Sequence, residues 1–265
     1  MGWKGATLKS KDDDKYWDDG ILLVSGCTPV SSGCDHCWSR GMQKRFGGDP
    51  DAVVFHAERL KRLETRRPTI ISIWNDLFHE KVGTTEIDQT FAHMALNPQN
   101  TYLVLTKRAW RMQNYFKELV FRQESIGIEA ESISGIDRFD RADPDNPKPR
   151  WKLPLSNVWL GVTAENQPMT DKRISQLLAT QAAVRIVSVE PMLDEIDIRE
   201  YLPTIKWAYD DELTNQTCYR DEPIRSAGAY QVRTNDEGVD WIVCGAETGA
   251  GRRPCKLEWV RSLVQ

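Results

Sequence analysis

The segment Thr69-Ile70-Ile71-Ser72-Ile73-Trp74-Asn75-Asp76 decides the fold, because a short apolar run ends abruptly in polar residues. A second segment of this kind, Thr101 to Thr106, is followed directly by Lys107 and Arg108. Apolar runs this short and this continuous indicate strands that are buried on both faces of a sheet. The helical periodicity between them predicts that the two strands are parallel.

Four further apolar runs extend the pattern along the chain. The predicted strands are 21–25, 69–74, 101–106, 157–163, 184–189 and 240–244. The predicted helices are 38–46, 85–96, 108–121 and 170–180, with a last one that starts near Leu257. Six strands that alternate with helices predict an α/β fold built from βαβ units. Segments at about 123–156 and 203–239 are polar and lack periodicity, so we interpret them as insertions in a single domain spanning 1–265.

The composition is that of a globular protein with a sizeable core. The 265 residues include 40% hydrophobic and 28% charged side chains, with 35 basic and 39 acidic groups for a net charge of -4. The apolar runs are far too short to span a bilayer. The first 20 residues lack the apolar segment of a secretory signal, so a cytoplasmic location and no membrane partner are expected.

Basic residues are concentrated in two parts of the chain. Residues 40–67 hold eight basic side chains against four acidic ones, and residues 107–122 hold five against one. Such segments are typical of phosphate-binding faces or of ordinary solvated helix faces. Both segments follow predicted strands, and we expect them to flank the site and hold the phosphates of a nucleic acid.

Three of the six cysteines lie within eleven residues, directly after the first predicted strand. Cys27, Cys34 and Cys37 form the spacing C-x6-C-x2-C, whereas the other three cysteines have no ligand spacing. Three thiolates on one loop can bind three irons of a four-iron cluster and leave the fourth iron open. The alternative is a tetrahedral zinc site completed by His36 or a distant cysteine.

Polar residues follow five of the six predicted strands. They are Asn75 and Asp76, Lys107 and Arg108, Thr163 to Asn166, Glu190, and Glu247. The carboxyl ends of parallel strands meet at one edge of a sheet, so these side chains predict a functional site there. Taken singly, each of them could instead cap the following helix.

The cysteine segment 25–38 resembles that of the radical S-adenosylmethionine (SAM) superfamily, and in particular of a bacteriophage-borne branch. The likeness continues in order over about residues 20–264. The further motifs are Asn75–Glu80, Leu105–Arg108, Leu160–Asn166, Ser188–Pro191 and Val243–Gly249. This sequence departs from the branch in its longer first cysteine gap, in Trp38 where Tyr is usual, and in Cys244 and Ala246 where glycines are usual. It ends where members continue through another apolar segment, which predicts either an open barrel or a shortened sequence.

The resemblance implies a partial (β/α)6 TIM-like barrel of the radical SAM type. It implies that Cys27, Cys34 and Cys37 are the metal ligands of a [4Fe-4S] cluster whose open iron binds SAM. Reductive cleavage of SAM would then give a deoxyadenosyl radical that abstracts hydrogen from the substrate. The implied cofactor-binding residues are His36, Trp74, Asn75, Asp76, Thr163 and Glu247. The implied catalytic residues, which would contact the substrate, are Lys107, Arg108, Glu165 and Glu190.

Phage enzymes of this general type act in the hypermodification of thymine in DNA, where an amino acid attached to the base methyl is rearranged. The resemblance therefore implies an aminomutase-like isomerase of a base-linked amino acid in DNA, served by a one-electron donor such as host flavodoxin in the host cytoplasm. One alternative is a radical SAM enzyme that repairs or methylates nucleic acid. The other is a non-catalytic, zinc-stabilised nucleic-acid-binding protein.

Overall fold

The computed structural model describes residues 15–140, 142, 147–203, 205–211, 216–220, 230–233, 238–248 and 251–263. For the strands between 205 and 233, the backbone alone is described.

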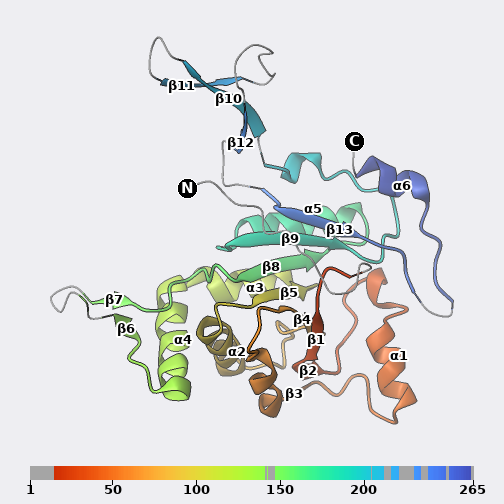
Figure 1. Ribbon diagram of the computed structural model, residues 1–265. Helices are drawn as coiled ribbons and strands as arrows, with labels where there is room; N and C mark the ends of the chain where they lie inside the picture. Colours follow the sequence, from red (N-terminus) through yellow and green to blue (C-terminus); the bar gives the residue numbers. More distant parts are fainter. Residues whose placement is uncertain are drawn as a thin grey trace.

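Six parallel strands form the main sheet, and their order in space is their order along the chain (Figure 1). They are β1 (Asp19–Leu22), β4 (Ile70–Trp74), β5 (Thr101–Thr106), β8 (Val158–Thr163), β9 (Val184–Val189) and β13 (Trp241–Cys244). Each crossover therefore moves the chain one strand further in the same direction, from β1 at one edge to β13 at the other. The predicted α/β class and the parallel sheet are confirmed.

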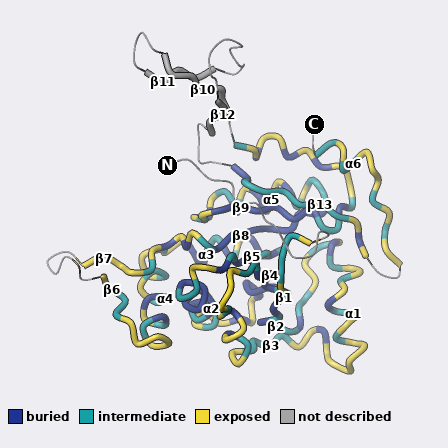
Figure 2. Tube along the Cα trace, viewed as in Figure 1, coloured by how far each residue is buried: buried dark blue, intermediate teal, exposed yellow. Residues whose placement is uncertain are grey.

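Helices cover one face of this sheet. The α-helices are α1 (Trp38–Arg45), α2 (Thr84–Leu96), α3 (Ala109–Lys117), α4 (Leu119–Ser134), α5 (Gln167–Leu178) and α6 (Leu257–Ser262). Short 3-10 turns occupy Ser32–Cys34, Ala57–Leu63 and Arg199–Tyr201. Side chains of α2 to α5, among them Phe91, Phe116, Ile126 and Ile174, join the strands in one large buried core (Figure 2).

Two predicted element boundaries are wrong. The run 21–25 is not one strand, because β1 ends at Leu22 and the separate strand β2 (Val24–Ser25) pairs antiparallel with β3 (Val54–Phe55). The helix predicted over 108–121 ends at Lys117, and α4 continues into the segment interpreted as an insertion. Gly127 and scattered polar residues obscure the periodicity of α4, which is stabilised by burial of its apolar side chains against α2.

The two polar segments contain short strands of their own. β6 (Phe139–Asp140) pairs with β7 (Lys148–Pro149) in the first segment. In the second, β10 (Ile205–Asp211), β11 (Gln216–Arg220) and β12 (Tyr230–Arg233) form an antiparallel sheet in the order β11-β10-β12. Among the described strands, none of these pairs with the six-stranded sheet.

The face of the main sheet turned away from α2 to α5, here called the second face, has a smaller apolar cluster. Leu103, Trp159 and Val184 are its buried members, and Tyr16, Trp17, Ile70 and Trp241 pack against them. Because side chains alternate along a strand, Thr163 and Ser188 point to this same face near the carboxyl edge. The second face is thus apolar at the amino end of the strands and polar at the carboxyl end.

Candidate functional site

The three clustered cysteines lie on a loop at the carboxyl edge of the sheet. This cysteine loop, residues 26–37, connects β2 to α1, and Cys37 is the residue that precedes the first turn of α1. Cys27, Cys34 and Cys37 are half-buried free thiols. Burial raises the pKa of the Cys27 thiol, and the nearby Asp76 carboxylate raises it further, whereas Arg108 opposes both effects.

Arg108, which follows β5, connects the start of the cysteine loop to the ends of two strands. Its Nη1 donates to Asp76 Oδ2 at 2.9 Å and to Cys27 Sγ at 3.6 Å. Its Nη2 donates to the carbonyl and hydroxyl oxygens of Thr28, and its Nε donates to Glu80 at 2.7 Å. All five N–H groups of this side chain, which is 2% exposed, therefore have protein partners.

Asp76, at the end of β4, is the carboxylate that pairs with Arg108. Its Oδ1 accepts hydrogen bonds from the Thr106 hydroxyl at 2.6 Å and from the Phe78 backbone N–H. Asn75 has a positive φ of 62°, and its amide donates to the Val24 carbonyl while its oxygen accepts from Ser39. These contacts join the end of β4 to β2 and α1, the two elements that flank the cysteine loop.

Glu165, after β8, contacts the middle of the loop. It is fully buried and forms an ion pair of 2.7 Å with Arg173 of α5, whose guanidinium also donates to Ser31. The Gly33 N–H points to Glu165 Oε1 at 3.4 Å, and a Cβ on Gly33 would lie 2.9 Å from the Glu165 carboxyl carbon. Burial raises the pKa of Glu165, but Arg173, Ser31 and Lys107 outweigh it and hold this pKa below its ordinary value.

Glu247, after β13, connects to the far end of the loop. It accepts hydrogen bonds from Arg253, including one of 2.6 Å from Nη2, and forms a contact of 2.9 Å with His36 Nδ1. Arg253 in turn contacts Asp35 and donates to the carbonyl of Ser32. The hydrogen bonds from Arg253 lower the pKa of Glu247 to about 2.

Glu190, after β9, is held from the second face. Its Oε2 accepts hydrogen bonds from the Tyr16 hydroxyl at 3.1 Å and from the Ser188 hydroxyl at 3.0 Å. Sequence patterns did not single out Tyr16, Arg173 or Arg253, because each partners a residue far away in the chain. The aromatic pair Tyr16-Trp17 just before the first strand was the one available signal for Tyr16.

The structure thus brings three of the predicted strand-end residues, Arg108, Glu165 and Glu247, into contact with the cysteine loop. Trp74 joins them by an edge contact with Trp38, at a ring separation of 5.2 Å. Helix capping explains few of these residues: Asn166 caps α5 through the Met169 N–H, whereas α2 begins after Gly83, well beyond Asp76. The ligand and catalytic roles predicted for these residues remain predictions.

The prediction that both basic segments flank the site is wrong for part of them. Arg66 and Arg67 precede β4, so they lie at the amino edge of the sheet, opposite the cysteine loop. Arg108 is buried with protein partners and does not offer its charge to phosphates. Two other basic groups, Lys44 and Lys81, act on Asp51 near the start of the loop, where they assist a hydrogen bond from Arg40 in lowering the pKa of Asp51.

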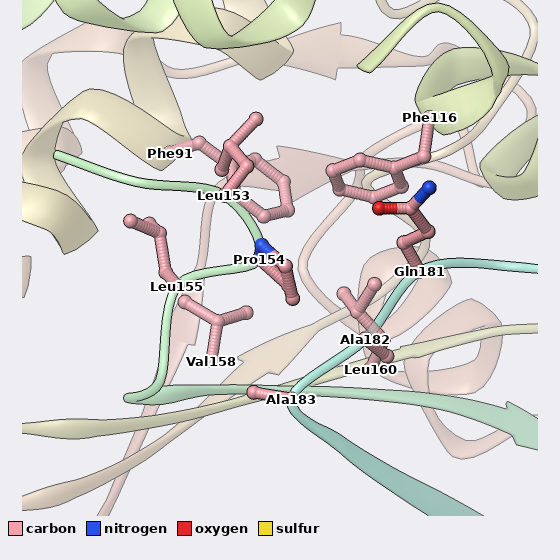
Figure 3. A pocket seen from close by; sticks show the side chains of 10 residues that line it. All are labelled: Phe91, Phe116, Leu153, Pro154, Leu155, Val158, Leu160, Gln181, Ala182 and Ala183. Carbon is pink, nitrogen blue, oxygen red and sulfur yellow. The ribbon is translucent and has the colours of Figure 1, made fainter. Parts of the chain in front are cut away.

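A cavity at the amino edge is too small to be a ligand site. It measures about 10 Å³ and is lined by apolar side chains of α2, α3 and the segment before β8, with Gln181 at its rim (Figure 3). This volume holds about one water molecule. The polar side chains that follow the strands lie at the other edge.

The chain is therefore an α/β protein with a parallel six-stranded sheet whose carboxyl edge supports a three-cysteine loop. It belongs to the family described as protein of unknown function (DUF5131), whose model matches residues 14–265. No curated protein and no solved structure matches it. No helix in the described residues is long and apolar enough to cross a membrane.

Proposed function

We propose that the chain is a radical SAM enzyme whose sheet forms a partial (β/α)6 barrel. The observation that supports this most strongly is the placement of the cysteine loop. Side chains that follow β4, β5, β8 and β13, namely His79, Arg108, Glu165 and Glu247, all contact it, so three thiols are held over the carboxyl edge where the active sites of parallel βα folds lie.

The donor set fits an iron-sulfur cluster better than a single zinc ion. Three thiolates around one zinc, at Zn–S distances of about 2.3 Å, would lie about 3.8 Å from one another. His36, which would complete a zinc site, lies between two of the cysteines and has its Nδ1 2.9 Å from Glu247 Oε2 instead. A four-iron cluster does not require the three sulfurs to lie this close together, because each thiolate binds a different iron.

Cys27, Cys34 and Cys37 would hold the [4Fe-4S] cluster, and the Arg108 N–H near Cys27 Sγ would offset part of its negative charge. A cluster with one open iron supplies, when bound with SAM and reduced, a deoxyadenosyl radical that takes hydrogen from a substrate. The proposed SAM contacts are His36 of the loop itself and Trp74, Asn75, Asp76, Thr163 and Glu247, which come from the ends of the three strands β4, β8 and β13.

For the substrate we propose a modified thymine base in DNA, with an amino acid linked to the base isomerised in an aminomutase-like reaction. Lys44 and Lys81 offer positive charge beside the cysteine loop, as a DNA backbone requires. A base inside a duplex is out of reach, so it would be flipped out or presented on a single strand. The electron would come from a donor such as host flavodoxin, in the cytoplasm of the host cell.

The test is anaerobic incubation with SAM, a strong reductant and phage DNA that contains the modified thymine, followed by mass spectrometry of the nucleosides. We expect a rearranged nucleoside of unchanged mass, formed when deoxyadenosine returns the abstracted hydrogen to the product radical, together with some deoxyadenosine and methionine from cleavage of SAM that is not coupled to product formation. A methylated or repaired base would favour the corresponding alternative radical enzyme. The absence of both SAM cleavage and any change in the DNA would contradict the proposal.

A further inference from the structure

Glu190 has one oxygen that is fully engaged and one that is open. Both hydroxyl donors, Tyr16 and Ser188, bind Oε2. Among the described residues, no hydrogen bond reaches Oε1, which faces the backbone of Gly245. A Cβ on residue 245 would lie 2.7 Å from this oxygen, so glycine keeps the space beside it free.

Lys107 supplies a positive charge at the same edge. It directly follows β5 and is half-buried. By the alternation along the strand it lies on the same face as Leu103, a member of the second-face cluster. Its charge acts on Glu165, but that carboxylate already has the Arg173 guanidinium at 2.7 Å. Within the described part of the chain, Lys107 forms neither a hydrogen bond nor an ion pair, so its ammonium is available to a ligand.

The spacing of the strands that carry these two groups allows them to bind the two ends of one α-amino acid. β5 and β9 are separated by the single strand β8, and neighbouring strands lie about 4.8 Å apart, so their ends are about 10 Å apart. An ammonium and a carboxylate about 3 Å apart, each with a hydrogen bond of about 2.8 Å to the protein, span about 9 Å. The flexible stem of Lys107 accommodates the difference.

We infer that the carboxyl end of the second face binds a zwitterionic amino-acid group, with its ammonium on Glu190 and its carboxylate on Lys107. This inference rests on the proposed function only in assigning that group to the substrate. Tyr16 and Ser188 are positioning residues, because they fix the Glu190 carboxylate and leave Oε1 for the ligand. Burial and the Glu190 charge raise the pKa of Tyr16, so its hydroxyl remains a donor at neutral pH.

The test compares three nucleosides as probes in calorimetric titrations of the anaerobically reconstituted protein. The first is thymidine whose 5-methyl group carries glycine through its nitrogen. The second has that nitrogen acetylated, and the third has the carboxylate converted to an amide. We expect the zwitterionic probe to bind about ten- to a hundred-fold more tightly than either neutralised probe, because hydrogen bonds between charged groups contribute that much.

Substitutions then assign each contact. In Glu190→Gln the advantage over the acetylated probe should disappear, and in Lys107→Met the advantage over the amide probe should disappear. Tyr16→Phe should weaken binding of the zwitterionic probe about three- to ten-fold and leave the acetylated probe unchanged, which a general loss of structure would not do. Glu195→Gln and Lys117→Met, at exposed positions away from the second face, are the matched controls and should bind all three probes as wild type does.

Equal binding of the three probes to the wild-type protein would overturn the inference, even if SAM is cleaved and the proposed function holds. Selectivity that survives both Glu190→Gln and Lys107→Met would overturn it as well. Conversely, the expected pattern in a protein that never cleaves SAM would support the zwitterion site and contradict the proposed radical chemistry.

Discussion

Arg108 joins three parts of the site through its five N–H groups, since it contacts the cysteine loop, the end of β4 and Glu80. Lysine cannot replace this pattern, because one ammonium cannot serve five acceptors in a planar arrangement. The sequence predicts that this residue binds a substrate carboxylate or phosphate. Its full set of protein partners makes it a residue that positions the loop instead.

Replacing Arg108 by Met should lower the free energy of unfolding by about 3 to 5 kcal/mol, because Asp76 would be left buried without its cation. Urea denaturation of the two proteins measures this difference. Arg45→Met, at an exposed position of α1, should change stability by less than about 0.5 kcal/mol. A loss below about 1 kcal/mol in Arg108→Met would show that the buried network does not hold the loop.

The pairing of Glu247 with Arg253 predicts a pH dependence with a definite sign. Because the folded-state pKa of Glu247 lies at about 2, below the ordinary 4.5, its contribution to stability is complete above pH 4.5 and is lost as the pH falls toward 2. At pH 7, Glu247→Gln should therefore be less stable than wild type by about 1 to 3 kcal/mol. Urea unfolding at pH 7 and pH 3 should show this gap shrinking with acid, and a gap that stays constant would contradict the assignment.

At the level of single residues, sequence reasoning found the ends of the strands but not their partners. The polarity of Asp76, Glu165 and Glu247 directly after apolar runs was visible in the chain. The cations that pair with Glu165 and Glu247 were not, because Arg173 and Arg253 lie on a later helix and loop whose return to the sheet no local pattern specifies. Distant pairs of this kind depend on the packing of the whole fold.

The cysteine loop is an element with little regular structure, held in place from both sides. Its closest approach to the sheet is at Gly33, which lies against the buried Glu165. A side chain there would push the loop away from the edge, because the ion pair with Arg173 keeps Glu165 from moving aside. Gly41, in α1, offers a control, because a Cβ added there would have no atom within 4 Å.

Gly33→Ala should reduce the iron content of the reconstituted protein by half or more while its circular dichroism stays that of wild type, because the loop alone would move. Gly41→Ala should retain the iron and gain up to about 1 kcal/mol of stability, since alanine favours an exposed helix. Equal iron content in both variants would show that the contact between the loop and Glu165 does not position the thiols.

Among the elements, those with a strong hydrophobic pattern were predicted well. The strand over 101–106 and the one over 184–189 match β5 and β9 residue for residue, because each is rich in apolar and β-branched residues and ends before a charged residue. The helix α4 escaped detection, since Gly127 interrupts its core-facing residues. Its stability comes from packing against α2, which no local pattern in the chain specifies.

At the scale of the whole molecule, the two edges of the sheet differ in their chemistry. The cysteine loop and Lys44 and Lys81 lie at the carboxyl edge, whereas Arg66 and Arg67 lie at the amino edge. A count of charges along the chain could not show this difference. Residues just before a strand lie at the amino edge of the sheet, whereas residues just after it lie at the carboxyl edge. The basic segment 40–67 is therefore not one surface.

Lys44→Glu combined with Lys81→Glu should weaken binding of single-stranded DNA and reduce the slope of log K against log salt by roughly 0.7 to 0.9 for each phosphate that the protein no longer binds. Fluorescence anisotropy over a range of salt concentrations measures both quantities. The double variant Arg66→Glu and Arg67→Glu, at the opposite edge, should bind as wild type does. The reverse result would place the DNA at the amino edge, away from the cysteines.

The central claim, that the cysteine loop holds a four-iron cluster, is tested most directly by iron and acid-labile sulfide analysis of the anaerobically reconstituted protein. We expect about four irons and four sulfides per chain in the wild type, and loss of the cluster when Cys27, Cys34 or Cys37 becomes Ala. Cys244→Ala and Cys255→Ala should keep the full cluster. A full cluster in any two of the three loop variants, or one tightly bound zinc in place of iron, would contradict the account.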